Sequence, residues 1–249
     1  MVPDTMLKTI RQILTINNLL CFVLLISLCG CSFNKQVEVS SQNVEQVQNT
    51  QPEKQFEQVF EKSEIPQDIK EKMLNVTISD KSHVTFDDLE YLTLTYYGYD
   101  DQSHIGNMVV DKQISDEVIS IFKELYEVKF PIEKMLLPCE YSGIDELSMR
   151  DNNTSAFNDR PIEGSGALSY HQLGRAIDIN PLVNPYIRFS DGEVLPTTAH
   201  EYLDRTKQVK GMIYEDDPCV KIFKKYGWVW GGDWNSVKDY QHFEKHQSK

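Results

Sequence analysis

The stretch SYHQLGRAIDIN, residues 169–180, places a histidine seven positions before an aspartate and ends in an alternating apolar pattern. The alternation predicts a short β-strand, because successive strand side chains point to opposite faces. Ile177 and Ile179 would then pack on the core. Ala176, Asp178 and Asn180 would share the other face, which leaves the Asp178 carboxylate on an open side. A carboxylate there needs solvent or a partner.

Gly174 separates His171 from this predicted strand. Glycine permits a tight turn, so we expect His171 to swing over the face that carries Asp178. A histidine and an aspartate that converge on one point are suitable zinc ligands. Such a pair also occurs in structural roles, so the assignment depends on further ligands elsewhere in the chain.

The C-terminal stretch KDYQHFEKH, residues 238–246, supplies His242 and, three residues before it, Asp239. A catalytic zinc needs about three protein ligands, an open position for water and a carboxylate that accepts the proton of that water. We therefore predict His171, Asp178 and His242 as metal ligands and Asp239 as the general base. In a regular strand Asp239 and His242 would face opposite sides, so a bend must lie between them. Glu244 shares the face of His242 and is the alternative base.

The bulk composition excludes several functions. The chain has 249 residues and a net charge of −13, which argues against binding to nucleic acid or electrostatic docking on anionic lipid. No CxxC pair and no HExxH motif occur, so neither a zinc ribbon nor the common helical zinc-protease layout is expected.

Two assignments stay open at this point. His246 is an alternative to His242 as third ligand. Cys139 and Cys219 could form a disulfide outside the cell or remain separate thiols.

The N-terminus reads as an export signal. Lys8 and Arg11 precede the apolar run LLCFVLLISLCGC, residues 19–31, which is shorter than the roughly 20 residues that span a bilayer. Its end resembles a bacterial lipobox, which implies acylation of Cys31; an uncleaved membrane anchor is the alternative. We assign residues 1–31 to a lipoprotein-type signal peptide, 32–66 to a flexible tether rich in Gln, Glu, Val and Ser, and 67–249 to the functional domain.

The sequence pattern of residues 67–249 predicts an α+β fold. Helices and strands do not alternate regularly, so we expect one compact domain with a small antiparallel sheet flanked by helices. Strands are expected at 89–100, at 106–111 and within 131–141, and helices at 115–130 and 218–227.

Taken together, SYHQLGRAIDIN and DYQHFE resemble the D-Ala-D-Ala carboxypeptidase (VanY-type) zinc metallopeptidases of the LAS group. The stretches SMRDNNTSAFNDRPI, residues 148–162, and WVWGGDW, residues 228–234, resemble its L-alanyl-D-glutamate endopeptidase branch. The similarity extends from about Thr93 to His242, and it implies a hedgehog/DD-peptidase-like fold.

The resemblance assigns roles residue by residue. The family's zinc ligands correspond to His171, Asp178 and His242. Asp239 corresponds to its general base, and Arg160 to an arginine that steadies the oxyanion or a substrate carboxylate, a task for which a fixed guanidinium is suited. Ser169 corresponds to a residue near the substrate.

The resemblance also implies a function: a monomeric, Zn²⁺-dependent peptidase that hydrolyses peptidoglycan stem peptides. The bond would be either the terminal D-Ala-D-Ala bond or the L-Ala-D-Glu bond. With the export signal, the expected location is extracytoplasmic, on the bacterial cell envelope through an N-terminal lipid anchor. The alternative is a non-catalytic, zinc-containing lipoprotein that binds the cell wall, because hedgehog domains use the same fold and metal site for binding.

Overall fold

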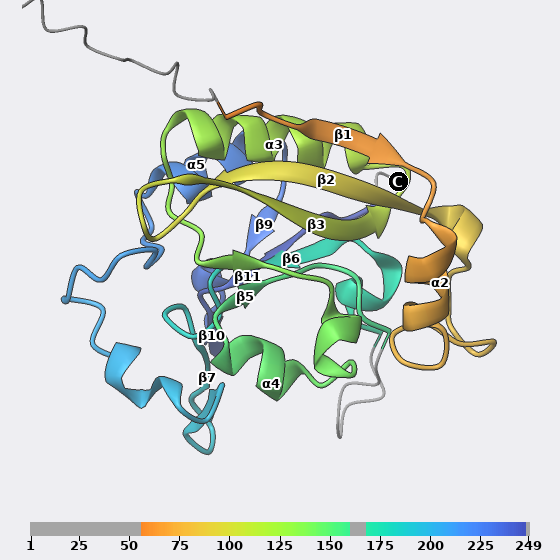
Figure 1. The fold of residues 1–249 in the computed structure, drawn as a ribbon. Helices are drawn as coiled ribbons and strands as arrows, with labels where there is room; N and C mark the ends of the chain where they lie inside the picture. The colour runs from red at the N-terminus through yellow and green to blue at the C-terminus, as the bar shows by residue number, and fades with distance from the viewer. Residues whose placement is uncertain (1–55, 160–167, 248–249) are drawn as a thin grey trace, which may run out of the picture. The chain divides into compact units, whose positions relative to one another are not determined.

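The computed structural model describes residues 56–159 and 168–247. Its first sheet is built around an antiparallel hairpin of two nine-residue strands, β2 (Leu89–Tyr97) and β3 (Ser103–Asp111), with β1 (Phe60–Ser63) along the free edge of β2. Both long strands are rich in β-branched and aromatic residues, which suit a pleated and half-buried surface. Leu92, Leu94 and Val110 are completely buried, so one face of the hairpin forms part of the core (Figure 1).

Strand β1 corrects the expected boundary of the tether. Residues 60–63 lie inside the range 32–66, yet they pair with β2 in antiparallel register, and the Val59 N–H donates to the Thr95 hydroxyl at 2.7 Å. The folded part therefore begins before residue 67. The strand reads FEKS and is largely exposed, so its composition resembles that of a solvated segment.

Two amphipathic helices complete the main core, α3 (Ser115–Glu127) and α5 (Pro218–Lys225). Helix α3 lies within the predicted range 115–130, and Val118, Ile121, Phe122 and Leu125 on its core-facing side are each at most 1% exposed. Helix α3 packs on β2 and on α5 (Figure 1). Helix α5 begins where the sequence predicts, because the Asp217 carboxylate accepts the Cys219 N–H at 2.7 Å and Pro218 occupies the first turn.

The remaining elements are short. A second sheet has the order β6 (Ala176–Asp178), β11 (His242–Glu244), β9 (Val229–Trp230), and a third has the order β10 (Val237–Asp239), β7 (Tyr186–Arg188), β8 (Glu193–Leu195). Both are antiparallel. A parallel pair joins β4 (Lys134–Met135) to β5 (Asn153–Thr154). Short helices are α2 (Gln67–Met73), α4 (Asp145–Arg150), η1 (Phe86–Asp88), η2 (Pro138–Tyr141), η3 (Tyr170–Leu173), η4 (Ala199–Tyr202) and η5 (Gly231–Asp233). The fold is α+β, as expected, with several small sheets where the sequence predicted one.

The second sheet is joined to the main core by its apolar face. Ile177 and Ile179 are completely buried, as the alternation predicts, and Phe243 of β11 stacks on Phe223 of α5 with ring centroids 4.0 Å apart. The strands that carry the predicted metal ligands are therefore fixed by hydrophobic contacts on the side away from the ligands. Burying two aromatic rings in this way contributes on the order of a few kcal/mol.

The structure also bears on the two cysteines and on membrane-spanning helices. Cys139 and Cys219 are free thiols, so the disulfide that the sequence left open does not form. No helix among the described residues combines the length and apolarity needed to cross a membrane. The predicted signal segment with Cys31 lies outside the described residues.

Candidate metal centre

His171 is presented by the short helix η3, whose two ends are set by local sequence. Ser169 caps the start: its hydroxyl accepts the His171 N–H at 3.2 Å, and its own N–H donates to Gln172 Oε1 at 2.8 Å. Gly174 ends the helix at φ +66°, where a Cβ would lie 2.6 Å from the Asp111 nitrogen. Only glycine satisfies both constraints, so the predicted turn between His171 and the next strand is confirmed.

Asp178 and His242 lie on adjacent strands. They are paired Cα partners of β6 and β11 in antiparallel register, and opposite side chains in such a pair are close neighbours on one face. Ala176 and Asn180, which were expected on the same side as Asp178, are both completely buried. Asn180 has φ +46° and donates to the carbonyls of Pro131 and Gly211. The strand therefore ends before it, and Asp178 alone reaches the opening.

The three predicted ligands converge. One donor atom from each of His171, Asp178 and His242 lies within 4.8 Å of the others. His171 Nε2 is 3.2 Å from His242 Nδ1 and 3.2 Å from Asp178 Oδ2, and His242 Nδ1 is 3.1 Å from Asp178 Oδ1. Tetrahedral zinc ligands at about 2.0–2.1 Å from the metal lie about 3.3 Å from one another, so this donor set fits a zinc ion.

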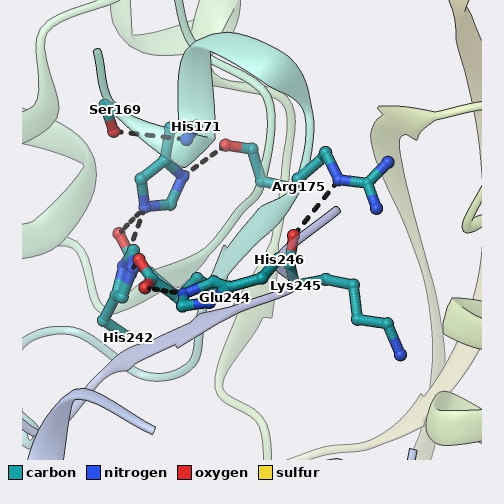
Figure 2. Close-up of polar contacts among 9 residues, drawn as sticks. Ser169, His171, Arg175, His242, Glu244, Lys245 and His246 are labelled. Carbon is teal, nitrogen blue, oxygen red and sulfur yellow. Dashed lines mark hydrogen bonds and ion pairs between the residues drawn. The ribbon is translucent and has the colours of Figure 1, made fainter. Parts of the chain in front are cut away.

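The outward nitrogens of both imidazoles have acceptors. His171 Nδ1 lies 2.6 Å from the Ala156 carbonyl oxygen, and His242 Nε2 lies 3.1 Å from Glu244 Oε2 (Figure 2). A proton held on each outward nitrogen leaves the inward nitrogen with a lone pair for a metal. Ala156 and Glu244 therefore complete an arrangement typical of protein metal sites.

The charges of the three ligands depend on one another. Burial opposes ionisation of Asp178, but the positive charge and hydrogen bond of His171, together with those of His242, hold the pKa of this carboxyl below its ordinary value. Burial lowers the pKa of His242, whereas its hydrogen bonds to Asp178 and Glu244 outweigh that effect and raise the pKa to about 10. A carboxylate between two imidazoles is thus poised to exchange a proton for a metal cation.

Asp239 lies beside this cluster on a different sheet. Strand β10 ends at Asp239 and pairs with β7, whereas β11 begins at His242 and pairs with β6. The intervening residues make the bend that the sequence required. Asp239 Oδ1 is buried and has no hydrogen-bond partner among the described residues. Burial raises the pKa of Asp239 to about 6, partly offset by the charge of His242.

Glu244, the alternative base, is engaged differently. Its Oε2 contacts His242 Nε2, and its Oε1 contacts His246 Nε2 at 2.7 Å. Burial alone would raise the pKa of Glu244, but the hydrogen bonds with His242 and His246 lower it. Both oxygens are therefore occupied, and among the described residues the group that could hold a metal includes His242 and not His246.

The other predicted site residues divide into three groups. Ser169 caps η3, which positions His171; its contact with substrate stays a prediction. Arg160 and Cys31 lie outside the described residues. Among the tryptophans, Trp228 and Trp230 are buried, whereas Trp234 is half-buried with its ring centroid 5.4 Å from that of His242.

A small cavity of about 10 Å³ adjoins two of the predicted ligands, His171 and Asp178. Its lining also includes Ala156 and the α4 residues Asp145, Ser148 and Met149. Sequence patterns did not predict α4 as part of the site. The signal was present, because SMR begins the stretch SMRDNNTSAFNDRPI, but a six-residue helix leaves too short a periodicity to recognise.

The fold and the site together define an α+β domain with two histidines and one aspartate that could hold a metal ion, and with the Asp239 carboxylate near them. A family model described as D-alanyl-D-alanine carboxypeptidase matches residues 163–245. The matched segment contains all three ligands as well as Asp239 and Glu244. No curated protein and no solved structure matches the chain. Residues 163–245 are thus similar to a peptidase family, and the resemblance expected from Thr93 onward is supported over this segment.

Proposed function

We propose that this chain is a zinc-dependent peptidase that hydrolyses the stem peptides of peptidoglycan at the cell envelope. The observation that carries the proposal is the close approach of His171, Asp178 and His242 near Asp239, whose Oδ1 is buried and has no hydrogen-bond partner among the described residues. The match of residues 163–245 to D-alanyl-D-alanine carboxypeptidases supports the same reaction class.

The donor set favours zinc over magnesium or calcium, because two imidazoles and one carboxylate suit zinc whereas the harder cations prefer oxygen ligands. A bound zinc ion would supply Lewis acidity, which activates a water molecule and polarises the scissile carbonyl. Three protein ligands leave room for a fourth, non-protein position, as catalytic zinc sites require.

Asp239 is suited to hold and move the proton of the attacking water. Its Oδ1 has no protein partner among the described residues, so it is available to a water or a substrate. Leaving a buried oxygen unpaired costs about 1–3 kcal/mol, a cost expected at a reacting group. A pKa near 6 lets Asp239 accept a proton at neutral pH and return it to the leaving amine. Arg160 is proposed to stabilise the negative charge that develops on the carbonyl oxygen.

The proposed location is extracytoplasmic, with the chain attached to the membrane through acylated Cys31. This rests on the N-terminal sequence alone. A tethered domain suits maintenance of the cell's own wall, since a lipid anchor holds the enzyme beside its polymeric substrate. The bond that is cut is proposed as either the terminal D-Ala-D-Ala bond or the L-Ala-D-Glu bond.

A product analysis tests the proposal and names the bond. The soluble part should include β1, which begins at Phe60, so it should not begin at residue 67. Incubation with defined pentapeptide muropeptides, with zinc or with a chelator, should give zinc-dependent fragments whose masses identify the cut. A protein that binds zinc but leaves every muropeptide intact would instead be a non-catalytic wall-binding module.

A further inference from the structure

Glu244 lies two residues after the proposed ligand His242 and contacts the ring nitrogen of His242 that faces away from the other two ligands. His242 points Nδ1 at Asp178 and His171, and its Nε2 faces Glu244 Oε2 at 3.1 Å. In the β11 strand, residues 242 and 244 lie on the same face, so the contact follows from strand geometry. The Glu244 side chain is only 13% exposed, which limits the other positions open to its carboxylate.

The carboxylate is itself held in place. His246 donates to the second oxygen, Oε1, at 2.7 Å, and the His246 ring stacks on Tyr170 of η3 with centroids 5.1 Å apart. Tyr170 is the immediate neighbour of His171. The contacts therefore run from η3, which carries His171, through His246 and Glu244 to the ring of His242. Figure 2 shows Glu244, His242 and His246 of this series.

This arrangement selects one tautomer of His242. A neutral imidazole has one N–H donor and one acceptor. A carboxylate at Nε2 accepts a hydrogen bond and so keeps a proton there, which lets Nδ1 give up its own proton and direct a lone pair at a bound metal. Without Glu244, the remaining carboxylate contact of the ring is that of Nδ1 with Asp178 Oδ1, so the proton would favour Nδ1, where it competes with the metal, and the ring would lose a contact that restrains its rotation.

We propose that Glu244 is a positioning residue for the metal centre: its carboxylate accepts the Nε2–H of His242 and thereby orients Nδ1 toward zinc, while Asp239 serves as the base. This inference rests on the metal site of the proposed function. Outer partners of metal-bound histidines commonly change metal affinity by about 10- to 100-fold, which sets the size of the expected effect.

Zinc affinity of the soluble chain, measured by competition with a chromophoric chelator, tests the proposal without reference to turnover. Glu244→Ala should weaken zinc binding by about 10- to 100-fold. Glu244→Gln retains an oxygen that accepts the Nε2–H, so it should recover most of the affinity. The visible spectrum of the cobalt-substituted protein, which reports ligand geometry, should change for Glu244→Ala and stay close to wild type for Glu244→Gln.

Glu124 offers a matched control, since it is a half-buried carboxylate that also binds two donors, Lys225 and Tyr226. Glu124→Ala should leave zinc affinity unchanged. If Glu244→Ala keeps wild-type affinity and cobalt spectrum, or if Glu244→Gln loses as much affinity as Glu244→Ala, the positioning role is wrong. Thermal unfolding in the presence of chelator shows whether Glu244→Ala folds. If it does not fold, the zinc affinity and cobalt spectrum of Glu244→Gln test the positioning role. Zinc binding without peptide cleavage by the wild type would overturn the proposed function and leave this inference standing.

Discussion

Asp178 and His242 face each other as register partners across β6 and β11, with Asp178 Oδ1 3.1 Å from His242 Nδ1. Two of the three proposed ligands are thus set by backbone pairing and not by loops. A register slip of one residue would turn every side chain of the moving strand to the opposite face. It would place Ile177 or Ile179 opposite His242 and remove the site.

The role of Asp239 predicts a large and specific loss of activity. Asp239→Asn should lower kcat by about 100- to 10,000-fold, the usual contribution of a general base, while zinc remains bound. Muropeptide turnover and metal content measured on the same sample check this. Asp233→Asn is the control, because that carboxylate lies in the preceding η5 helix and pairs with Lys224. Near-normal activity of Asp239→Asn would show that another group is the base.

The raised pKa of Asp239 predicts a pH-dependent stability difference in the metal-free protein. The folded chain binds the proton up to about pH 6, whereas the unfolded chain releases it near the ordinary value of 3.8. The stability penalty therefore grows as the pH rises from about 4 to 6 and is constant above 6.

Asp239→Asn removes this titration, so it should raise the free energy of unfolding by about 2–3 kcal/mol at pH 7. The gain should shrink toward zero as the pH falls to 4. Urea unfolding of both proteins in chelator at several pH values measures it. A gain of equal size at pH 4 and pH 7 would contradict the assignment.

Gly231 sets the distance between the η5 helix and Asp239. A Cβ at this position would lie 2.7 Å from the Asp239 carbonyl oxygen and 2.8 Å from its Cβ, so Gly231→Ala must displace one of the two segments. We expect activity to fall by about 10- to 100-fold, because an error of about 1 Å at a reacting group has that effect. Gly192→Ala is the control: it introduces strain at φ +75° with no atom within 4 Å, so its activity should stay normal. Equal activity losses in both variants would point to a general defect.

The buried ion pair of Arg175 and Asp111 predicts a loss of stability. Arg175 Nη1 lies 2.6 Å from Asp111 Oδ2, and Arg175 Nε donates to the Lys245 carbonyl. Asp111→Asn leaves a buried guanidinium without its counter-charge, which should lower the free energy of unfolding by about 3–5 kcal/mol. Asp191→Asn, which breaks the exposed pair with Arg188, should cost less than about 1 kcal/mol. Thermal unfolding of the two variants side by side makes the comparison.

Local sequence patterns predicted where the two main helices begin and which residues of the ligand-bearing strand are buried. The starts of α3 at Ser115 and of α5 at Pro218 and the buried pair Ile177 and Ile179 follow from periodicity and helix-start signals in the sequence. The ligand set came from residue type, spacing and the family resemblance, and the structure brings those three residues together. Arg175 anchors its segment because its guanidinium is buried against Asp111.

Long-range pairing accounts for what the sequence did not reveal. Asp239 and His242 belong to different sheets because β10 pairs with β7, some fifty residues earlier in the chain, and no local signal reports that partner. Strand β1 likewise has no local signal, because its residues form a strand through their pairing with β2. The sequence also placed Glu244 on the face of His242, but the contact of its Oε2 with His242 Nε2 appears only in the structure.

Strand β1 has a mechanical consequence if the chain is anchored as we propose. Tension on the N-terminal segment would enter the fold at this four-residue strand, which is held by its ladder to β2 and by the ion pair of Lys62 with Asp116. The strands that carry Asp178 and His242 belong to a separate sheet. Under tension, β1 would separate from β2 before the other strands are disturbed. The proposed metal ligands would then keep their relative positions while the enzyme is bound to the wall polymer.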